Sequence, residues 1–296
     1  MTRGVVEDVL RPRVIRALTL NVWNRSGPWP ERLRLIRREL AELSPDVVGL
    51  QEVMRVLRPG THEPLSPAHD QAAELADGLG YEIAYAPAAD YGEGLVMGNA
   101  VLSRFPLFEA RAERLPDAGT GEHRSLIYAL AGTEWGRLPV FVTHLNWRLD
   151  HGFVRLAQVL HVAARVEELA PVSAGFLPPV LMGDFNAAPE ADEIRYLTGL
   201  SVQKGRSCHF ADAWVYGGDG SAGTTYDPRN DYARRNREPP RRIDYIFVRG
   251  PDAELRGEPL ATKVVFNTPE PAVGGPLWPS DHFGVFTEIA VEPRSL

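Results

Sequence analysis

Six short segments of the chain place side chains suited to metal or phosphate chemistry at the end or the start of an apolar run. In chain order they read LNVW, LQEV, THL, GDFN, RIDYIF and SDHFGV. The side chains are carboxylates, carboxamides and imidazoles: Asn21, Glu52, His144, Asp184, Asn186, Asp244, Asp281 and His282. A single aspartate after a strand is more often a turn former than a catalytic group. Six such coincidences in one chain indicate a shared site instead.

The apolar runs that would position these side chains have the character of β-strands. They are short, rich in β-branched and aromatic residues, and bounded by Gly, Pro or Asp. The expected strands span 14–23, 46–53, 99–104, 125–131, 138–145, 179–186, 242–248 and 283–290. Helical spacing predicts helices over 31–43, 69–79 and 152–169, the last with a buried stripe of Phe153, Leu156, Leu160, Ala163 and Val166. Because strands exceed helices and the two are interspersed, we expect an α/β fold of two packed sheets flanked by helices.

The chain has the length and composition of one large globular domain. It contains 296 residues, of which 44% are hydrophobic and 24% are charged. No internal repeat or Ser/Gly-rich linker divides it. We therefore expect a single domain over residues 14–291, with an N-terminal extension of residues 1–13 and a C-terminal tail of residues 292–296.

Several classes of protein are disfavoured. The single cysteine, Cys208, excludes an internal disulfide and a cysteine-built metal site. The charged N-terminus lacks the apolar core of a signal peptide, and no run approaches the ~20 apolar residues of a membrane span, so we expect a cytoplasmic protein. The net charge of -7 disfavours a protein that depends on non-specific duplex binding. The motifs of P-loop enzymes, α/β-hydrolases and HExxH zinc proteases are absent.

In this order and spacing, the motifs LNVW, LQEV, THL, GDFNAAP, RRIDYIF and SDHFGV resemble those of the endonuclease/exonuclease/phosphatase superfamily, which has the DNase I-like fold. The resemblance covers roughly residues 14–291. It implies a four-layer α/β sandwich, in which two central, mainly antiparallel β-sheets are flanked by helices. It also implies a hydrolase of phosphate esters that depends on Mg²⁺, with Mn²⁺ or Ca²⁺ as the alternatives.

Within this resemblance, the residue types suggest individual roles. Glu52 is the leading metal ligand because Mg²⁺ prefers carboxylate oxygens, and Asn21 and Asp281 would complete the protein ligands. Asp184 is expected to orient and deprotonate the attacking water. Asn186 lies two positions further along an extended segment, so it faces the same side and could hold Asp184 or a phosphate oxygen.

The histidines have two expected roles. His282 and Asp244 resemble a pair in which the carboxylate fixes the imidazole tautomer and favours its charged form. A cationic His282 would stabilise the transition state at the phosphate. His144 would donate to another phosphate oxygen or assist the leaving group. In DNase I-like proteins the equivalent histidine is supported by a glutamate; here Glu93 is the candidate, with a solvated turn as the alternative.

Arginines supply candidate phosphate contacts. Arg124, just before SLIYAL, could bind a phosphate or be an ordinary surface arginine. Five arginines precede Asp244, namely Arg234, Arg235, Arg237, Arg241 and Arg242. We expect a mobile basic loop at the rim of the site, with Arg241 and Arg242 as phosphate contacts and with Tyr226 and Tyr232 stacking on bases. A solvated loop whose charges serve solubility is the alternative.

The THL motif bears on the substrate class. Abasic endonucleases place a tyrosine where His144 stands, so the motif favours the branch that holds DNase I, sphingomyelinases, deadenylases and inositol phosphatases. A nuclease-like phosphodiesterase with nucleic acid as its partner is the favoured function. A small-molecule or lipid-headgroup phosphoesterase, sphingomyelinase-like or inositol-phosphate-like, is the alternative. A catalytically inactive binding scaffold is a remote one.

Overall fold

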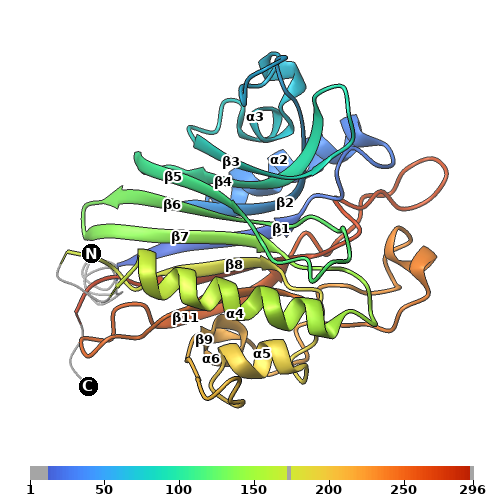
Figure 1. Ribbon diagram of the computed structural model, residues 1–296. Coiled ribbons are helices and arrows are strands. Elements are labelled where there is room, and N and C mark those ends of the chain that lie inside the picture. Colours follow the sequence, from blue (N-terminus) through green and yellow to red (C-terminus); the bar gives the residue numbers. More distant parts are fainter. Residues whose placement is uncertain (1–12, 172–174, 294–296) are drawn as a thin grey trace, which may run out of the picture.

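The computed structural model describes residues 13–171 and 175–293, and within them twelve strands form two six-stranded sheets (Figure 1). The first sheet has the order β11 (Pro259–Val265), β12 (Gly284–Ala290), β1 (Val14–Asn21), β2 (Val47–Val56), β4 (Leu95–Ser103) and β3 (Glu82–Asp90). The second has the order β5 (Leu107–Arg114), β6 (Ser125–Thr133), β7 (Gly136–His144), β8 (Val180–Asp184), β10 (Asp244–Val248) and β9 (Ala211–Asp212).

Each sheet holds a single parallel pair near its centre. The pairs are β1 with β2 and β7 with β8, while every other neighbouring pair runs antiparallel. The expectation of mainly antiparallel sheets is therefore confirmed. Because the carboxyl ends of parallel strands meet at one edge, these two pairs are where polar groups at strand ends can gather.

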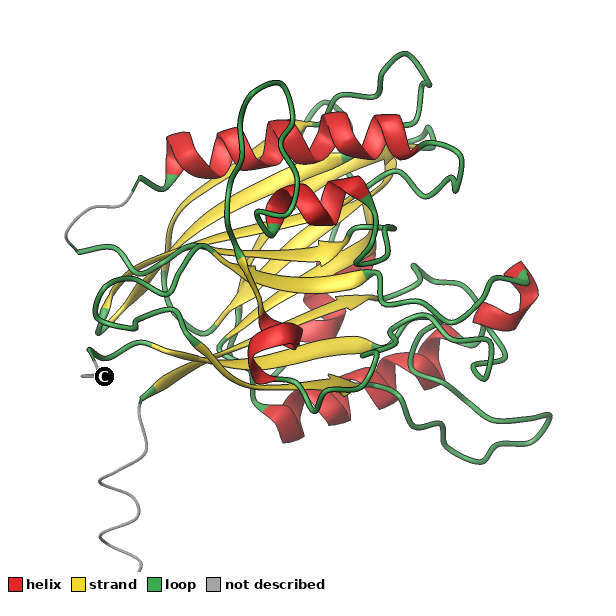
Figure 2. Cartoon of the chain, turned by 90° about the horizontal axis from the view of Figure 1, so that it is seen from below, coloured by secondary structure: helices red, strands yellow, loops and turns green. Residues whose placement is uncertain are grey.

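Helices cover the outer faces of both sheets, and Figure 2 shows the strands between the helical layers. The helices α2 (Trp29–Leu43) and α3 (Gln71–Ala76) share a hydrophobic core with the first sheet. The helices α4 (Gly152–Leu169) and α5 (Asp192–Leu197) share another with the second sheet. Three shorter elements are η1 (Pro67–His69), α6 (Ala213–Gly217) and η2 (Ala233–Asn236). The predicted four-layer α/β sandwich is the observed architecture.

A third core lies between the sheets, built by the alternation of side chains along each strand. In β8, Val180 and Met182 face this inner core, whereas Leu181 faces the helices. The sheets approach closely at Gly49, where an added Cβ would lie 2.7 Å from Met182 Cγ. Only a glycine therefore fits at this position without moving a layer.

The predicted strands and helices are present, with shifted ends. The strands that the sequence did not reveal are β3, β5, β9 and β11, the four edges of the two sheets. An edge strand pairs on one side only, so it carries a weaker apolar pattern than a central strand. In β5, for example, five of the eight residues are exposed, and the exposed positions do not alternate regularly.

The predicted bounds of α4 are right, but its predicted buried stripe is only partly right: Ala163 and Val166 are buried and Leu160 packs against the core, whereas Phe153 is not part of it. Phe153 is 59% exposed, whereas Val159 and Val162 are fully buried. Arg155 and Gln158 share the buried face, where they bond Glu193 and the backbone N–H of Asn146. Two polar residues with buried partners therefore hid the true face from an apolar pattern. Across the described ranges no helix has the length and apolar character to cross a bilayer.

Candidate active site

The register of the second sheet aligns three of the predicted site residues. His144 at the end of β7 pairs with Asp184 at the end of parallel β8, and Asp184 pairs with Asp244 at the start of antiparallel β10. In β8 the inward alternation of Val180 and Met182 continues to Asp184, so its side chain points toward the first sheet. The strand pattern that builds the inner core thus also directs the carboxylate.

Gly183 explains how β7 and β8 come close enough for this row. Its φ is +148°, and an added Cβ would lie 1.9 Å from the carbonyl oxygen of Thr143. A side chain at this position would push the two strands apart and tilt Asp184 away from His144. The glycine in GDFN is therefore required by the close backbone approach beside the carboxylate.

Asp184 accepts from, or faces, donors at both of its oxygens. Oδ1 accepts from the backbone N–H of Asn186 at 2.9 Å. Oδ2 lies 3.0 Å from Asn21 Nδ2, 3.3 Å from His144 Nε2 and 3.7 Å from His282 Nε2. The residue is 1% exposed, and burial followed by repulsion from Asp244 raises the pKa of Asp184 to about 6. Asp184 is thus a fixed carboxylate with an enhanced affinity for a proton.

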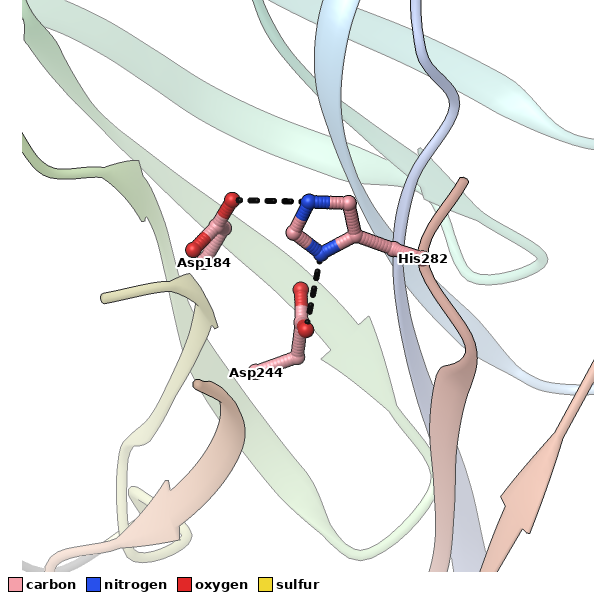
Figure 3. A group of neighbouring side chains, drawn as sticks. All are labelled: Asp184, Asp244 and His282. Atoms are coloured by element: carbon pink, nitrogen blue, oxygen red, sulfur yellow. Dashed lines mark hydrogen bonds and ion pairs between the residues drawn. The ribbon is translucent and has the colours of Figure 1, made fainter. Parts of the chain in front are cut away.

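His282 lies between two carboxylates (Figure 3). Its Nδ1 lies 3.0 Å from Asp244 Oδ2, and its Nε2 faces Asp184. Burial alone would lower the pKa of His282, but Asp244 and the other nearby carboxylates raise it well above the ordinary value. The structure thus provides the predicted Asp244 partner of His282, and the raised pKa favours its charged form.

Glu52 is aimed by an irregularity in β2. The register of β2 against β4 shifts between Leu50 and Val53, and Glu52 has a φ of +58°. Such bulges redirect a side chain near a functional site. The carboxylate accepts from Asn21 Nδ2 at 3.2 Å and from Asn24 Nδ2 at 3.0 Å. Glu52 is thereby brought to the same carboxamide that contacts Asp184.

Asp281 completes a group of carboxylates that suits a cation. It is buried, and burial raises the pKa of Asp281 to about 7, with Glu52 and Asp184 adding repulsion. A divalent cation would relieve this repulsion, and carboxylate oxygens are its preferred ligands. Asn21 contributes less directly, because its Oδ1 accepts from the backbone N–H of Trp23 at 3.0 Å.

A second arrangement for a metal deserves comparison. Asp184, Asp244 and His282 have ligand atoms that all lie within 4.8 Å of one another. The neighbouring carboxylates raise the pKa of His282 and favour its protonated form, which would have to lose a proton before it could bind a metal. Figure 3 shows this cluster, in which the imidazole of His282 lies between the carboxylates of Asp184 and Asp244.

The predicted residues surround a cavity of about 230 Å³. Its lining includes eight of them, namely Glu52, His144, Asp184, Asn186, Tyr226, Arg241, Asp281 and His282. It also includes residues that the sequence reading missed, among them Trp23, Asn24, Trp147, Asn236 and Glu238. Trp147 follows His144 by three positions and is 56% exposed. In the sequence, the only available signal was a tryptophan close after the THL motif, in an expected loop.

Trp23 is a rigid part of the wall. Its ring stacks on that of Tyr232, with the ring centroids 4.7 Å apart. The guanidinium of Arg32 lies over the ring, 4.9 Å from its centroid, in a cation–π contact. Arg32 is fully buried and donates to the carbonyl oxygen of Val22 at 3.2 Å. The sequence pattern did not single out Arg32, so this support for the loop was missed.

The arginines and Glu93 lie differently from the predictions. Arg241 lines the cavity, whereas Arg242 bonds Asp212 at 2.7 Å and is buried, so Arg242 supports the fold. Arg124 is also buried and contacts His144 Nδ1 at 2.8 Å, so it is not free to reach a phosphate. Glu93 is exposed in the turn between β3 and β4, and the position predicted for it beside His144 is taken by Arg124.

The tyrosines predicted to stack on bases both pack against rings of the protein, although Tyr226 also lines the cavity. Tyr226 is 4% exposed and its ring lies 4.9 Å from that of His282. Tyr232 is occupied by its stack on Trp23. Part of the expected basic loop forms η2, and Arg234 within it pairs with Asp231 at 2.7 Å.

Comparison with known proteins agrees with this geometry. The model of the Endonuclease/Exonuclease/phosphatase family matches residues 18–282. The chain therefore belongs to this family. It is 29% identical over 182 residues to Protein angel of Drosophila melanogaster. The aligned region covers 58% of this chain and 47% of that protein. The chain thus spans about half the length of this curated relative.

Solved structures share the fold. The endonuclease/exonuclease/phosphatase from Beutenbergia cavernae superposes with a TM-score of 0.69 at 25% identity, covering 94% of this chain and 72% of that one. TDP2 from D. rerio in complex with a single-strand DNA product superposes with a TM-score of 0.66 at 18% identity, covering 93% and 98%. Divalent-metal dependence is a property of the family, and the buried acidic and imidazole groups are consistent with it.

Proposed function

We propose that the protein is a nuclease-like phosphodiesterase in which Asp184 activates the attacking water. The observation that carries this proposal is the state of Asp184, a buried carboxylate with donors around both oxygens and a pKa raised to about 6. A general base works best when its pKa lies near the working pH and its position is fixed. Asp184 meets both conditions.

The remaining groups fit roles around a phosphate. The charged His282, held by Asp244, faces the same space as Asp184 and can stabilise negative charge that develops on the phosphoryl oxygens. Asn186 keeps the Asp184 carboxylate oriented through its backbone N–H. Glu52 and Asp281 would hold Mg²⁺, and a bound divalent cation would polarise a phosphoryl oxygen and offset charge on the leaving group.

Nucleic acid is the proposed substrate class. Trp147 exposes an aromatic face at the cavity, and the guanidinium of Arg148 lies 5.5 Å from its ring. Bases stack on such rings, while Arg241 in the cavity wall can pair with a backbone phosphate. The structure of TDP2 with a single-strand DNA product concerns a protein of the same fold, which adds support.

A substrate panel tests the proposal. Single- and double-stranded DNA and RNA would be compared with phosphomonoesters and lysophospholipids, each with Mg²⁺ and with EDTA. We expect Mg²⁺-dependent cleavage of the nucleic acids that weakens steeply as salt rises. Cleavage of only phosphomonoesters or lipids would replace the substrate class, and turnover of none of the substrates would favour the binding scaffold.

Two variants sharpen the comparison. Trp147→Ala should raise KM for oligonucleotides by roughly 5- to 100-fold, the cost of losing one stacked base. It should leave hydrolysis of a small aryl phosphodiester unchanged. Leu149→Ala is the matched control, because Leu149 is 61% exposed nearby but is not a cavity residue. The single domain over residues 14–291 and the cytoplasmic location remain proposals, which limited proteolysis and cell fractionation would test.

A further inference from the structure

A second network of polar side chains contacts His144 on its Nδ1 side, away from Asp184. Glu122 Oε1 accepts from Arg124 Nε at 2.7 Å, and Arg124 Nη2 lies 2.7 Å from the same oxygen. Asn146 Nδ2 donates to the other oxygen of Glu122, also at 2.7 Å. The remaining guanidinium nitrogen, Nη1, lies 2.8 Å from His144 Nδ1. Arg124 and His144 are only 7% and 5% exposed, so the geometry of this contact is fixed by its surroundings.

The contact determines which nitrogen of His144 carries the proton. A guanidinium has five N–H donors and no acceptor. Nδ1 of His144 must therefore accept from Arg124, and a neutral imidazole that accepts at Nδ1 carries its hydrogen on Nε2. Nε2 lies 3.3 Å from Asp184 Oδ2, so this N–H is directed at the reactive carboxylate and the cavity.

The two histidines beside Asp184 are thus in opposite states. Nδ1 of His282 faces the carboxylate of Asp244, which accepts a hydrogen bond and favours a proton on that nitrogen. Nδ1 of His144 faces a cation, which prevents a proton from binding there. Burial, Arg124 and His282 together lower the pKa of His144 well below the ordinary value, in agreement with the geometry.

We propose that Arg124 is a positioning residue that keeps His144 as a neutral Nε2–H donor. His144 then acts by donating a hydrogen bond to a phosphoryl oxygen and does not act as the acid for the leaving group. This role rests on the proposed phosphodiesterase function, but the tautomer itself does not. Glu122 supports this arrangement because its carboxylate contacts two nitrogens of Arg124 and so fixes the plane of the guanidinium.

The tautomer can be measured on the free protein without any substrate. The chain contains eight histidines, and His144→Gln identifies the His144 signals in long-range ¹H–¹⁵N spectra of histidine-labelled protein. We expect His144 to show a protonated Nε2 and an unprotonated Nδ1 from pH 5 to pH 8. A protonated Nδ1, or a doubly protonated ring, would overturn the proposal whether or not the protein cleaves phosphodiesters.

Variants of Arg124 provide the second arm. Arg124→Met should give a mixture of tautomers or a ring that titrates, and it should lower kcat by about 10- to 100-fold, as loss of an orienting partner of a site histidine does. Arg124→Lys keeps a cationic donor and should preserve the Nε2–H form. An unchanged His144 spectrum in Arg124→Met would contradict the assignment, provided that thermal unfolding shows the variant to be folded.

A double-mutant cycle separates positioning from general stability. If Arg124 acts through His144, adding Arg124→Met to His144→Gln should lower kcat by less than about twofold further. Independent, multiplicative losses would show that Arg124 does not act through His144. If the wild-type protein shows the predicted tautomer but cleaves no phosphodiester, the proposed function fails and the assignment of Arg124 stands.

Discussion

The carboxamide of Asn21 donates to Asp184 Oδ2 across 3.0 Å, although the two residues are 163 positions apart and lie in different sheets. The same nitrogen lies 3.2 Å from Glu52 Oε1. Asn21 therefore connects the proposed base with the proposed metal ligand, and it does so from the end of β1. The sequence suggested Asn21 as a metal ligand, and its contacts add a second role, in which its Nδ2 organises two carboxylates.

Asp184→Asn should lower kcat by ~10²–10⁴, the usual contribution of a positioned general base. The amide keeps the shape of the carboxylate but takes up no proton from water. Affinity for Mg²⁺ should change little, which isothermal titration of the metal would check. Turnover at the wild-type rate on a true substrate would contradict the role of Asp184.

Glu52→Gln should act on the metal requirement instead. Removing one carboxylate charge weakens the attraction for a hard cation. We expect the Mg²⁺ concentration that gives half-maximal activity to rise by at least about tenfold, while the rate at saturating Mg²⁺ recovers substantially. Comparing Mg²⁺ dependence in Glu52→Gln and Asp184→Asn separates the two roles, and an identical effect in both would argue against them.

The stability of the metal-free protein should decrease as pH rises from about 4 to about 7. Burial raises the pKa of Asp281 to about 7, so the folded state holds a proton that the unfolded chain has already lost in this range. A group with a raised folded pKa stabilises the fold at low pH and loses that contribution as pH passes the folded value.

The variant Asp281→Asn tests this relation. At pH 8 in EDTA it should unfold at a temperature at least ~3 °C above that of the wild type, because it removes a buried charge without changing the side-chain shape. Added Mg²⁺ should raise the Tm of the wild type more than that of the variant. An unchanged pH dependence in the variant would show that another group is responsible.

Gly183→Ala should destabilise the fold by more than about 2 kcal/mol, since both backbone strain and a collision with Thr143 oppose the added methyl. Gly78→Ala is the control. Gly78 also has a positive φ, of +69°, but open space surrounds its Cβ position, so only about 1 kcal/mol is expected. Urea unfolding measures both, and equal losses would show that the contact with Thr143 does not matter.

Much of the site was predictable because it follows from strand ends. A polar side chain that directly follows a buried strand is visible in the sequence, as at Asp184 and His144, and parallel pairing then brings such ends together. Arg124 was visible as a residue but not as a partner of His144, since that contact joins neighbouring antiparallel strands whose register the sequence does not state. The edge strands were missed because a strand that pairs on one side only carries a weaker apolar pattern.

Glu52 shows a different limit. Its residue type indicated a metal ligand, but the bulge that aims it depends on how β2 meets β4. Trp147 was overlooked because an exposed tryptophan has no periodic pattern, and its importance comes only from the cavity beside it. Local chemistry was therefore readable, whereas orientation required the assembled sheets.

The close contact of the two sheets at Gly49 affects how the protein loses turnover on heating. The proposed base lies on one sheet and the histidine that pairs with Asp244 comes from the other, so their spacing depends on the seating of Met182 against Gly49. A larger side chain at position 49 would push the two sheets apart and separate the reacting groups before any strand unfolds. Turnover would then decline at temperatures where circular dichroism still reports a folded protein.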